Sequence, residues 1–138
     1  MKPVLLDTGV IVALFDRSEK FHSECAELLH TLDAPLVTCE AVLAETCYLL
    51  RNLPGAAEAA IENVAAGIFQ LPFQLSSQAA AVKPILRKYR DRKIDLADAC
   101  LIHLANEFGT AEVLTLDSDF QIYRWGKSKP FHILPALK

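Results

Sequence analysis

The chain lacks the sequence patterns that mark several common enzyme classes. Its four cysteines form no C-x-x-C pair and its four histidines form no H-E-x-x-H motif, so the sequence predicts no zinc site. It also has no glycine-rich phosphate loop and no serine or cysteine in a nucleophile elbow. We therefore expect the cysteines to be buried, reduced thiols and the histidines to have no catalytic role.

Long hydrophobic runs are also missing. No apolar stretch approaches the ~20 residues that a membrane-spanning helix needs. Lys2 and the apolar residues after it are weakly similar to a signal peptide, but Asp7 interrupts the run and no small-residue cleavage site follows. With 138 residues and no internal repeats, the chain is expected to form one cytoplasmic domain over residues 1–138.

Charge is unevenly distributed along the chain. Residues 1–82 contain ten acidic and four basic residues, whereas residues 83–138 contain seven acidic and ten basic residues. The ordinary interpretation is a solvated helix face. The alternative is a basic rim that contacts phosphates beside an acidic centre. Its candidate residues are Arg87, Arg90, Arg92, Lys93, Arg124 and Lys127.

Short apolar segments alternate with segments of helical periodicity. This alternation is typical of an α/β fold with a parallel sheet that is covered on both faces. The expected strands are residues 4–6, 36–38, 73–75, 113–116 and 131–134. The expected helices are residues 9–15, 18–32, 39–53, 56–69, 76–89 and 95–108, followed by a short helix within 117–123.

Four acidic residues lie in unusually apolar surroundings. Asp7 and Asp117 end apolar strands, whereas Glu45 and Asp98 lie inside apolar helices. Because a buried carboxylate is costly unless it is paired or bound to a cation, and few basic residues are near in sequence, we expect a shared divalent metal. Strand ends are also where open α/β sheets bind ligands. Carboxylates that hold Mg²⁺ are suited to phosphodiester hydrolysis.

Several of these acids have a plausible structural role. Asp7 and Asp95 are well placed to cap the helices that follow them, and for Asp95 we favour capping over metal ligation. Asp117 and Asp119 are typical turn residues. Glu45 has no such role, because it lies in the middle of a helix. Capping and turns do not explain why acids recur in four separate apolar segments.

The order of these motifs resembles that of the PIN-domain ribonucleases, specifically the small VapC-type toxins of toxin–antitoxin pairs. Leu5-Leu6-Asp7-Thr8-Gly9 is similar to the first motif of the family. Glu45 matches the acid of the second motif, and Asp98 matches the aspartate of the third. The segment 115–120, with the sequence TLDSDF, is similar to the fourth motif. The resemblance extends over essentially the whole chain.

The resemblance implies a three-layer α/β/α sandwich with a mostly parallel sheet of about five short strands. It also implies endonucleolytic cleavage of RNA, with Mg²⁺ or Mn²⁺ held by Asp7, Glu45, Asp98 and Asp117. Asp119 is an alternative or additional ligand. Supporting roles around the metal fall to Thr8, Thr115 and Asp95. Further implied properties are a homodimer and an antitoxin that covers the site.

Three alternatives remain open from the sequence. The chain could be a PIN nuclease of RNA processing without a toxin role, or a non-catalytic PIN-like module that binds RNA or protein. A phosphatase or phospho-acceptor domain with a nucleophilic aspartate is a third possibility. It is disfavoured because haloacid-dehalogenase phosphatases have Asp-x-Asp where this chain has Asp7-Thr8-Gly9. The sequence does not identify the RNA target.

Overall fold

The computed structural model describes residues 2–135. A five-stranded, all-parallel sheet forms its centre, in the order β3-β2-β1-β4-β7. Its strands are β1 (Val4–Leu6), β2 (Leu36–Val37), β3 (Phe69–Gln70), β4 (Glu112–Leu114) and β7 (His132–Leu134). A separate antiparallel pair consists of β5 (Arg124–Trp125) and β6 (Lys129–Pro130).

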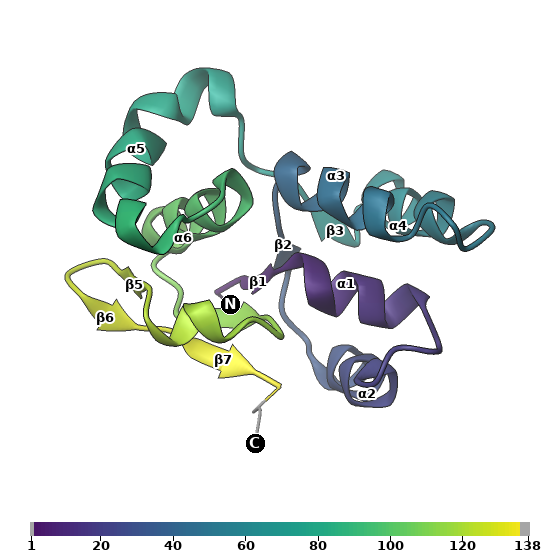
Figure 1. Ribbon diagram of the computed structural model, residues 1–138. Coiled ribbons are helices and arrows are strands. Elements are labelled where there is room, and N and C mark those ends of the chain that lie inside the picture. Colours follow the sequence, from purple (N-terminus) through teal and green to yellow (C-terminus); the bar gives the residue numbers. More distant parts are fainter. Residues whose placement is uncertain (1, 136–138) are drawn as a thin grey trace.

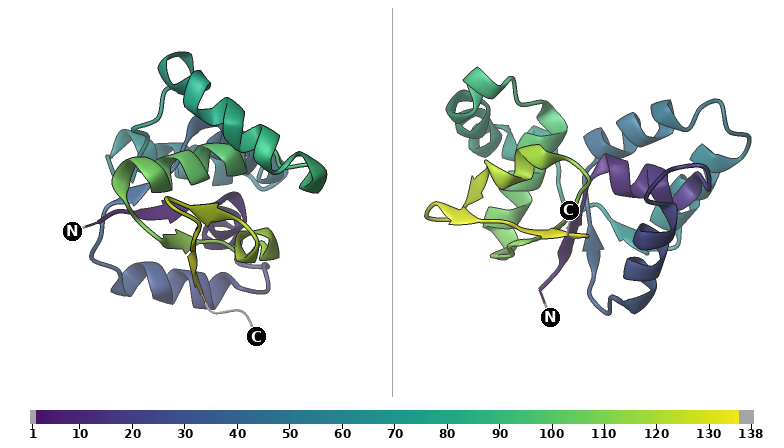
Figure 2. Two further views of the ribbon diagram at one scale, coloured as in Figure 1. Left: turned by 90° about the vertical axis from the view of Figure 1, so that its left-hand side faces the viewer. Right: turned by 60° about the horizontal axis from the view of Figure 1, so that its bottom comes forward.

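Six α-helices cover the sheet on two sides (Figure 1). The connections from β1 to β2 and from β2 to β3 carry four of them on one side: α1 (Thr8–Phe15), α2 (His22–Thr31), α3 (Glu40–Leu49) and α4 (Ala56–Ala65). The long connection from β3 back to β4 carries α5 (Leu75–Lys88) and α6 (Leu96–Phe108) on the other side, as the right-hand view of Figure 2 shows. The fold is therefore the predicted three-layer α/β/α sandwich.

Two central elements explain why the core forms where it does. All three residues of β1 are buried, because helices cover both faces of this strand and β2 and β4 flank it. Helix α6 is buried continuously from Ala97 to Ala105 and lies against β1. Asp95 caps its first turn and Gly109, with φ of 60°, ends it, as the sequence predicted. The buried carboxylate of Asp98 thus lies in an element whose ends are well defined.

Two short 3₁₀ helices flank the end of the sheet where the acids lie. Helix η1 (Arg90–Arg92) leads into α6, and η2 (Ser118–Gln121) follows β4. Asp117 caps η2 by accepting a hydrogen bond from the amide of Asp119 at 2.9 Å. The turn and short helix predicted for residues 117–123 are therefore present.

The third strand was predicted in the wrong place. It lies at Phe69–Gln70 rather than at residues 73–75, because α4 ends at Ala65 and Gly67 adopts φ of 79°. The chain consequently enters the sheet earlier, with Phe69 opposite Leu36. Phe73 is buried against the ring of His103 instead of lying in a strand.

Other differences concern the ends of elements. Helix α2 begins at His22 rather than Ser18, whose hydroxyl bonds to Asp16. Helix α3 ends at Leu49 rather than Leu53, because the chain turns after Leu50. The β5–β6 hairpin was not predicted, since its strands are too short to show a period. The structure buries Cys25, Cys39 and Cys100, as predicted, whereas Cys47 on α3 is only half-buried.

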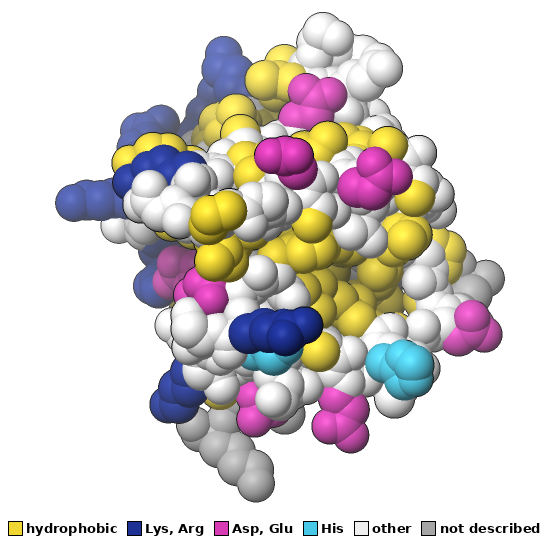
Figure 3. Space-filling model, turned by 90° about the vertical axis from the view of Figure 1, so that its right-hand side faces the viewer, with side chains coloured by type: hydrophobic (Ala, Val, Ile, Leu, Met, Phe, Trp, Pro, Cys, Tyr) yellow, Lys and Arg dark blue, Asp and Glu magenta, His cyan; other side chains and the backbone are white. Residues whose placement is uncertain are grey.

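Figure 3 shows the side of the molecule on which α1, α2 and α4 lie, where apolar side chains surround a hollow and Asp and Glu side chains lie around it. Within residues 2–135, no helix is both long and apolar enough to span a bilayer.

Candidate metal centre

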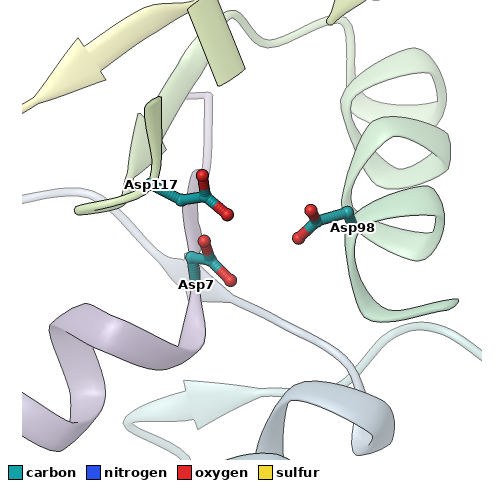
Figure 4. Close-up of side chains that lie close together, drawn as sticks. All are labelled: Asp7, Asp98 and Asp117. Atoms are coloured by element: carbon teal, nitrogen blue, oxygen red, sulfur yellow. The ribbon is translucent and has the colours of Figure 1, made fainter. Parts of the chain in front are cut away.

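Three aspartates from distant parts of the chain converge at the carboxyl edge of the sheet. Asp7 follows β1, Asp117 follows β4, and Asp98 lies in the first turn of α6 (Figure 4). One carboxylate oxygen from each aspartate lies within 4.8 Å of those of the other two. Because β1 and β4 are parallel neighbours, their ends necessarily lie side by side, and α6 brings Asp98 opposite them.

Asp7 is fixed from two directions. Its Oδ1 accepts a hydrogen bond from the amide of Thr8 at 2.8 Å, which caps α1. Its Oδ2 accepts one from the hydroxyl of Thr115 at 2.6 Å. That hydroxyl oxygen in turn accepts a bond from the amide of Asp117 at 3.0 Å, so one threonine joins two of the three aspartates. Asp7 therefore caps a helix and belongs to the cluster, two roles that the sequence presented as alternatives.

Asp98 is held by a residue that the sequence analysis did not select. The hydroxyl of Tyr123 donates a hydrogen bond to Asp98 Oδ2 at 3.1 Å. Asp95 does not join the three-aspartate cluster. Its side chain accepts from the amide of Asp98 at 2.8 Å, as a helix cap does. A weak signal for Tyr123 was available in the sequence, namely a tyrosine a few residues after the fourth acidic motif.

Burial makes the negative charges of this site costly. Asp7 and Asp98 are only 6% and 7% exposed. Burial raises the pKa of Asp7 to about 6, although the hydrogen bonds from Thr115 and Thr8 oppose this shift. Burial, followed by the nearby charge of Asp7, raises the pKa of Asp98 to about 8. Burial also raises the pKa of Tyr123 far above its usual value, so its hydroxyl stays protonated and donates.

Basic side chains do not neutralise this cluster. None of the ion pairs among the described residues includes Asp7, Asp98 or Asp117. Arg92 pairs with Asp119 at 3.3 Å, and both side chains are substantially exposed. Asp119 is accordingly engaged at the rim, whereas Asp117 belongs to the cluster. Three carboxylates so close together are therefore compensated either by protonation of the buried pair, whose pKa values are raised, or by a cation from solution.

The cluster opens into a hollow of about 480 Å³. Glu45 from α3 lines this hollow, but its side chain is exposed and lies outside the group of three. Thr8 also lines it, and the buried Thr8 hydroxyl oxygen has no hydrogen-bond partner within the described residues. A buried polar atom without a partner, beside three carboxylates, indicates a place for water or a ligand oxygen.

The residues predicted to contact phosphate have different environments. Arg92, on η1, extends to Asp119 beside the cluster. The Nη1 group of Arg124 instead donates to the carbonyls of Gln121, Ile122 and Tyr123, so it stabilises the turn after η2. The other candidates are exposed: Arg87, Arg90, Lys93 and Lys127.

Comparison with known proteins identifies the family. The sequence model of the PIN domain matches residues 4–126. The chain belongs to the PIN-domain family. A curated relative, ribonuclease VapC26 of Mycobacterium tuberculosis, is 31% identical over 116 residues, which cover 83% of this chain and 86% of that protein. The three aspartates therefore lie within the matched PIN domain.

A solved structure agrees with this PIN assignment at the level of the fold. The crystal structure of Mycobacterium tuberculosis VapC20, described as a toxin that cleaves the sarcin–ricin loop, matches with a TM-score of 0.79. The match covers 92% of this chain and 99% of that chain, with 20% sequence identity. The element order and the layers described above are thus those of a VapC-type PIN domain.

Proposed function

We propose that this PIN domain is a metal-dependent endoribonuclease and the toxin of a toxin–antitoxin pair. The observation that carries the proposal is the cluster of Asp7, Asp98 and Asp117, whose oxygens lie within 4.8 Å of one another without a basic partner among the described residues. The ribonuclease name of VapC26 supports the reaction class. The toxin described for VapC20 supports the biological role, but not the same RNA target, because its identity to this chain is low.

The residues present fit a hard divalent cation such as Mg²⁺ or Mn²⁺. All three side chains offer carboxylate oxygens, which are the ligands that Mg²⁺ prefers, and one oxygen of each lies within 4.8 Å of those of the other two. A bound ion of this kind supplies a Lewis acid for the phosphate and lowers the pKa of the attacking water. Glu45, which lines the same hollow, is proposed as a further ligand acting directly or through water.

The side chains of this domain perform the remaining tasks. Thr115 and the amide of Thr8 hold the two oxygens of Asp7, so this carboxylate needs no reorientation when RNA arrives. The unpartnered Thr8 hydroxyl is placed to orient a water molecule or a phosphate oxygen in the hollow. Arg92, Arg90 and Lys93 lie next to the start of α6, where they would attract the RNA backbone to the rim.

Protein partners follow from the same family assignment. We propose a homodimer and a cognate antitoxin that covers the site. Exposed apolar side chains support such contacts, because large ones remain uncovered on α3 and α4: Tyr48, Leu49 and Ile61 are 61%, 53% and 47% exposed. The hollowed apolar surface on the side of α1, α2 and α4 is a second candidate for a protein contact (Figure 3).

Cleavage of total cellular RNA with Mg²⁺ and with EDTA, comparing the wild type with Asp7→Asn, tests the proposal. We expect discrete fragments that require both Mg²⁺ and Asp7, with a loss of activity on the order of a thousandfold in the variant. Sequencing the fragment ends would identify the RNA target. A folded Asp7→Asn protein that cuts RNA at the wild-type rate would refute the proposed mechanism.

A further inference from the structure

Among the polar groups near the cluster, Tyr123 is held in place by the aromatic rings packed around it. Its side chain is 1% exposed. Its ring makes edge-to-face contacts with Tyr89 at 5.0 Å and with Phe120 at 5.1 Å between centroids. The hydroxyl at the end of this ring meets Asp98 Oδ2 at 3.1 Å. A rigid aromatic support therefore ends in a hydrogen bond to one of the three aspartates.

We propose that Tyr123 is a positioning residue that orients the Asp98 carboxylate for a divalent cation, an inference that rests on the proposed function. Tyr123 occupies Oδ2 of Asp98, while Oδ1 receives no hydrogen bond from the described residues. A carboxylate with one oxygen tethered has fewer orientations to lose when a cation binds. The segment after β4 thus supplies both the exposed ligand Asp117 and the buried hydroxyl that orients Asp98.

The other buried aspartate of the site, Asp7, is held by a hydroxyl in the same way. Its carboxylate is held by the hydroxyl of Thr115, as that of Asp98 is held by Tyr123. Each buried aspartate therefore has one hydroxyl donor, and both donors come from the segment that begins at the end of β4. Asp117, the exposed member of the cluster, instead accepts a hydrogen bond from the amide of Asp119.

The competing explanation is that Tyr123 only fills the core. The variant Tyr123→Phe separates the two, because it retains the ring and its contacts and removes the oxygen. Tyr89→Phe is a matched control: its ring lies in the same aromatic cluster, but its hydroxyl accepts a bond from the amide of Arg124 at 2.8 Å and donates to no carboxylate among the described residues. Thermal melts in EDTA would establish that both variants fold.

The test is titration of Mn²⁺ onto the wild type and both variants, with free Mn²⁺ followed by electron paramagnetic resonance. We expect Tyr123→Phe to raise the Kd for Mn²⁺ roughly tenfold to a hundredfold. Tyr89→Phe should remain close to the wild type. In RNA cleavage, Tyr123→Phe should need more Mg²⁺ for half-maximal rate and regain much of kcat at saturating Mg²⁺.

Two results would overturn the inference while leaving the metal site intact: unchanged Mn²⁺ affinity in Tyr123→Phe, or an equal loss in Tyr89→Phe, which would reveal a packing effect. A wild type that binds no Mn²⁺ would refute the metal centre itself, and the inference with it. Mn²⁺ binding that depends on Tyr123 without any RNA cleavage would support the positioning role and contradict the ribonuclease proposal.

Discussion

The site has an inner and an outer half that differ in solvation. The inner half, Asp7 and Asp98, is almost completely buried, and each carboxylate is tethered by a hydroxyl donor. The outer half, Asp117 and Glu45, is exposed. Burial makes ionisation of the inner pair unfavourable, whereas water stabilises the charges of the outer pair. We therefore infer that the charges of the inner half destabilise the folded protein and that the outer half faces the substrate.

The largest expected consequence of this difference is a pH-dependent stability of the metal-free protein. Because the pKa values of Asp7 and Asp98 are raised to about 6 and about 8, both groups favour folding when protonated. Their contribution is fully present below about pH 4 and is lost as the pH rises through these values. We expect the free energy of unfolding in EDTA to fall by on the order of 5 kcal/mol between pH 4 and pH 8.

The variant Asp98→Asn sharpens this prediction, since it removes the charge with the larger pKa shift. In urea denaturation with EDTA, the free energy of unfolding of the variant should fall less than that of the wild type between pH 4 and pH 8. At pH 8 the variant should be more stable than the wild type. Saturating Mg²⁺ should stabilise the wild type, by about 2.7 kcal/mol at a hundred times its Kd, and should stabilise the variant less. If the free energy of unfolding of the wild type did not change over this pH range, ionisation of Asp7 and Asp98 would not be what destabilises the metal-free protein.

The acids of this site were predictable because they break the local rules of the sequence. A carboxylate at the end of an apolar strand or in an apolar helix has few explanations, so Asp7, Asp98 and Asp117 could be selected without knowledge of the fold. The structure brings these three together. Their metal-binding and catalytic roles remain predictions, as does the role of Glu45, which lines the same hollow at a greater distance from the group.

The supporting contacts could not be derived in the same way. Thr115 was selected as a possible supporting residue, but its donation to Asp7 depends on the register between β1 and β4. Tyr123 was missed because an aromatic residue after a turn is most simply explained as core. The misplaced third strand has a similar cause: Phe69 and Phe73 are both buried, and local periodicity does not decide which one pairs with β2.

A smaller effect is expected from Glu45→Gln on the outer half. Glu45 is exposed and makes no hydrogen bond among residues 2–135, so the free energy of unfolding should change by less than about 0.5 kcal/mol. Cleavage should fall by roughly tenfold to a hundredfold, because one ligand or water-orienting oxygen is removed. Single-turnover rates and urea denaturation measure the two quantities. A loss as complete as that of Asp7→Asn would show that both halves are equally necessary.

The smallest effect is expected at the rim, from Arg92→Ala. Arg92 pairs with Asp119 between two well-exposed side chains, and such a pair contributes little to stability. If Arg92 contacts an RNA phosphate, its loss should weaken RNA binding by severalfold and reduce the salt dependence of binding by about one unit of slope.

Lys20→Ala is the control, because Lys20 follows the end of α1 that is remote from the cluster. Binding of an uncleaved RNA to the Asp7→Asn background, measured across NaCl concentrations, gives both slopes. Equal slopes for the two variants would remove Arg92 from the RNA contacts and leave its ion pair with Asp119 as its role.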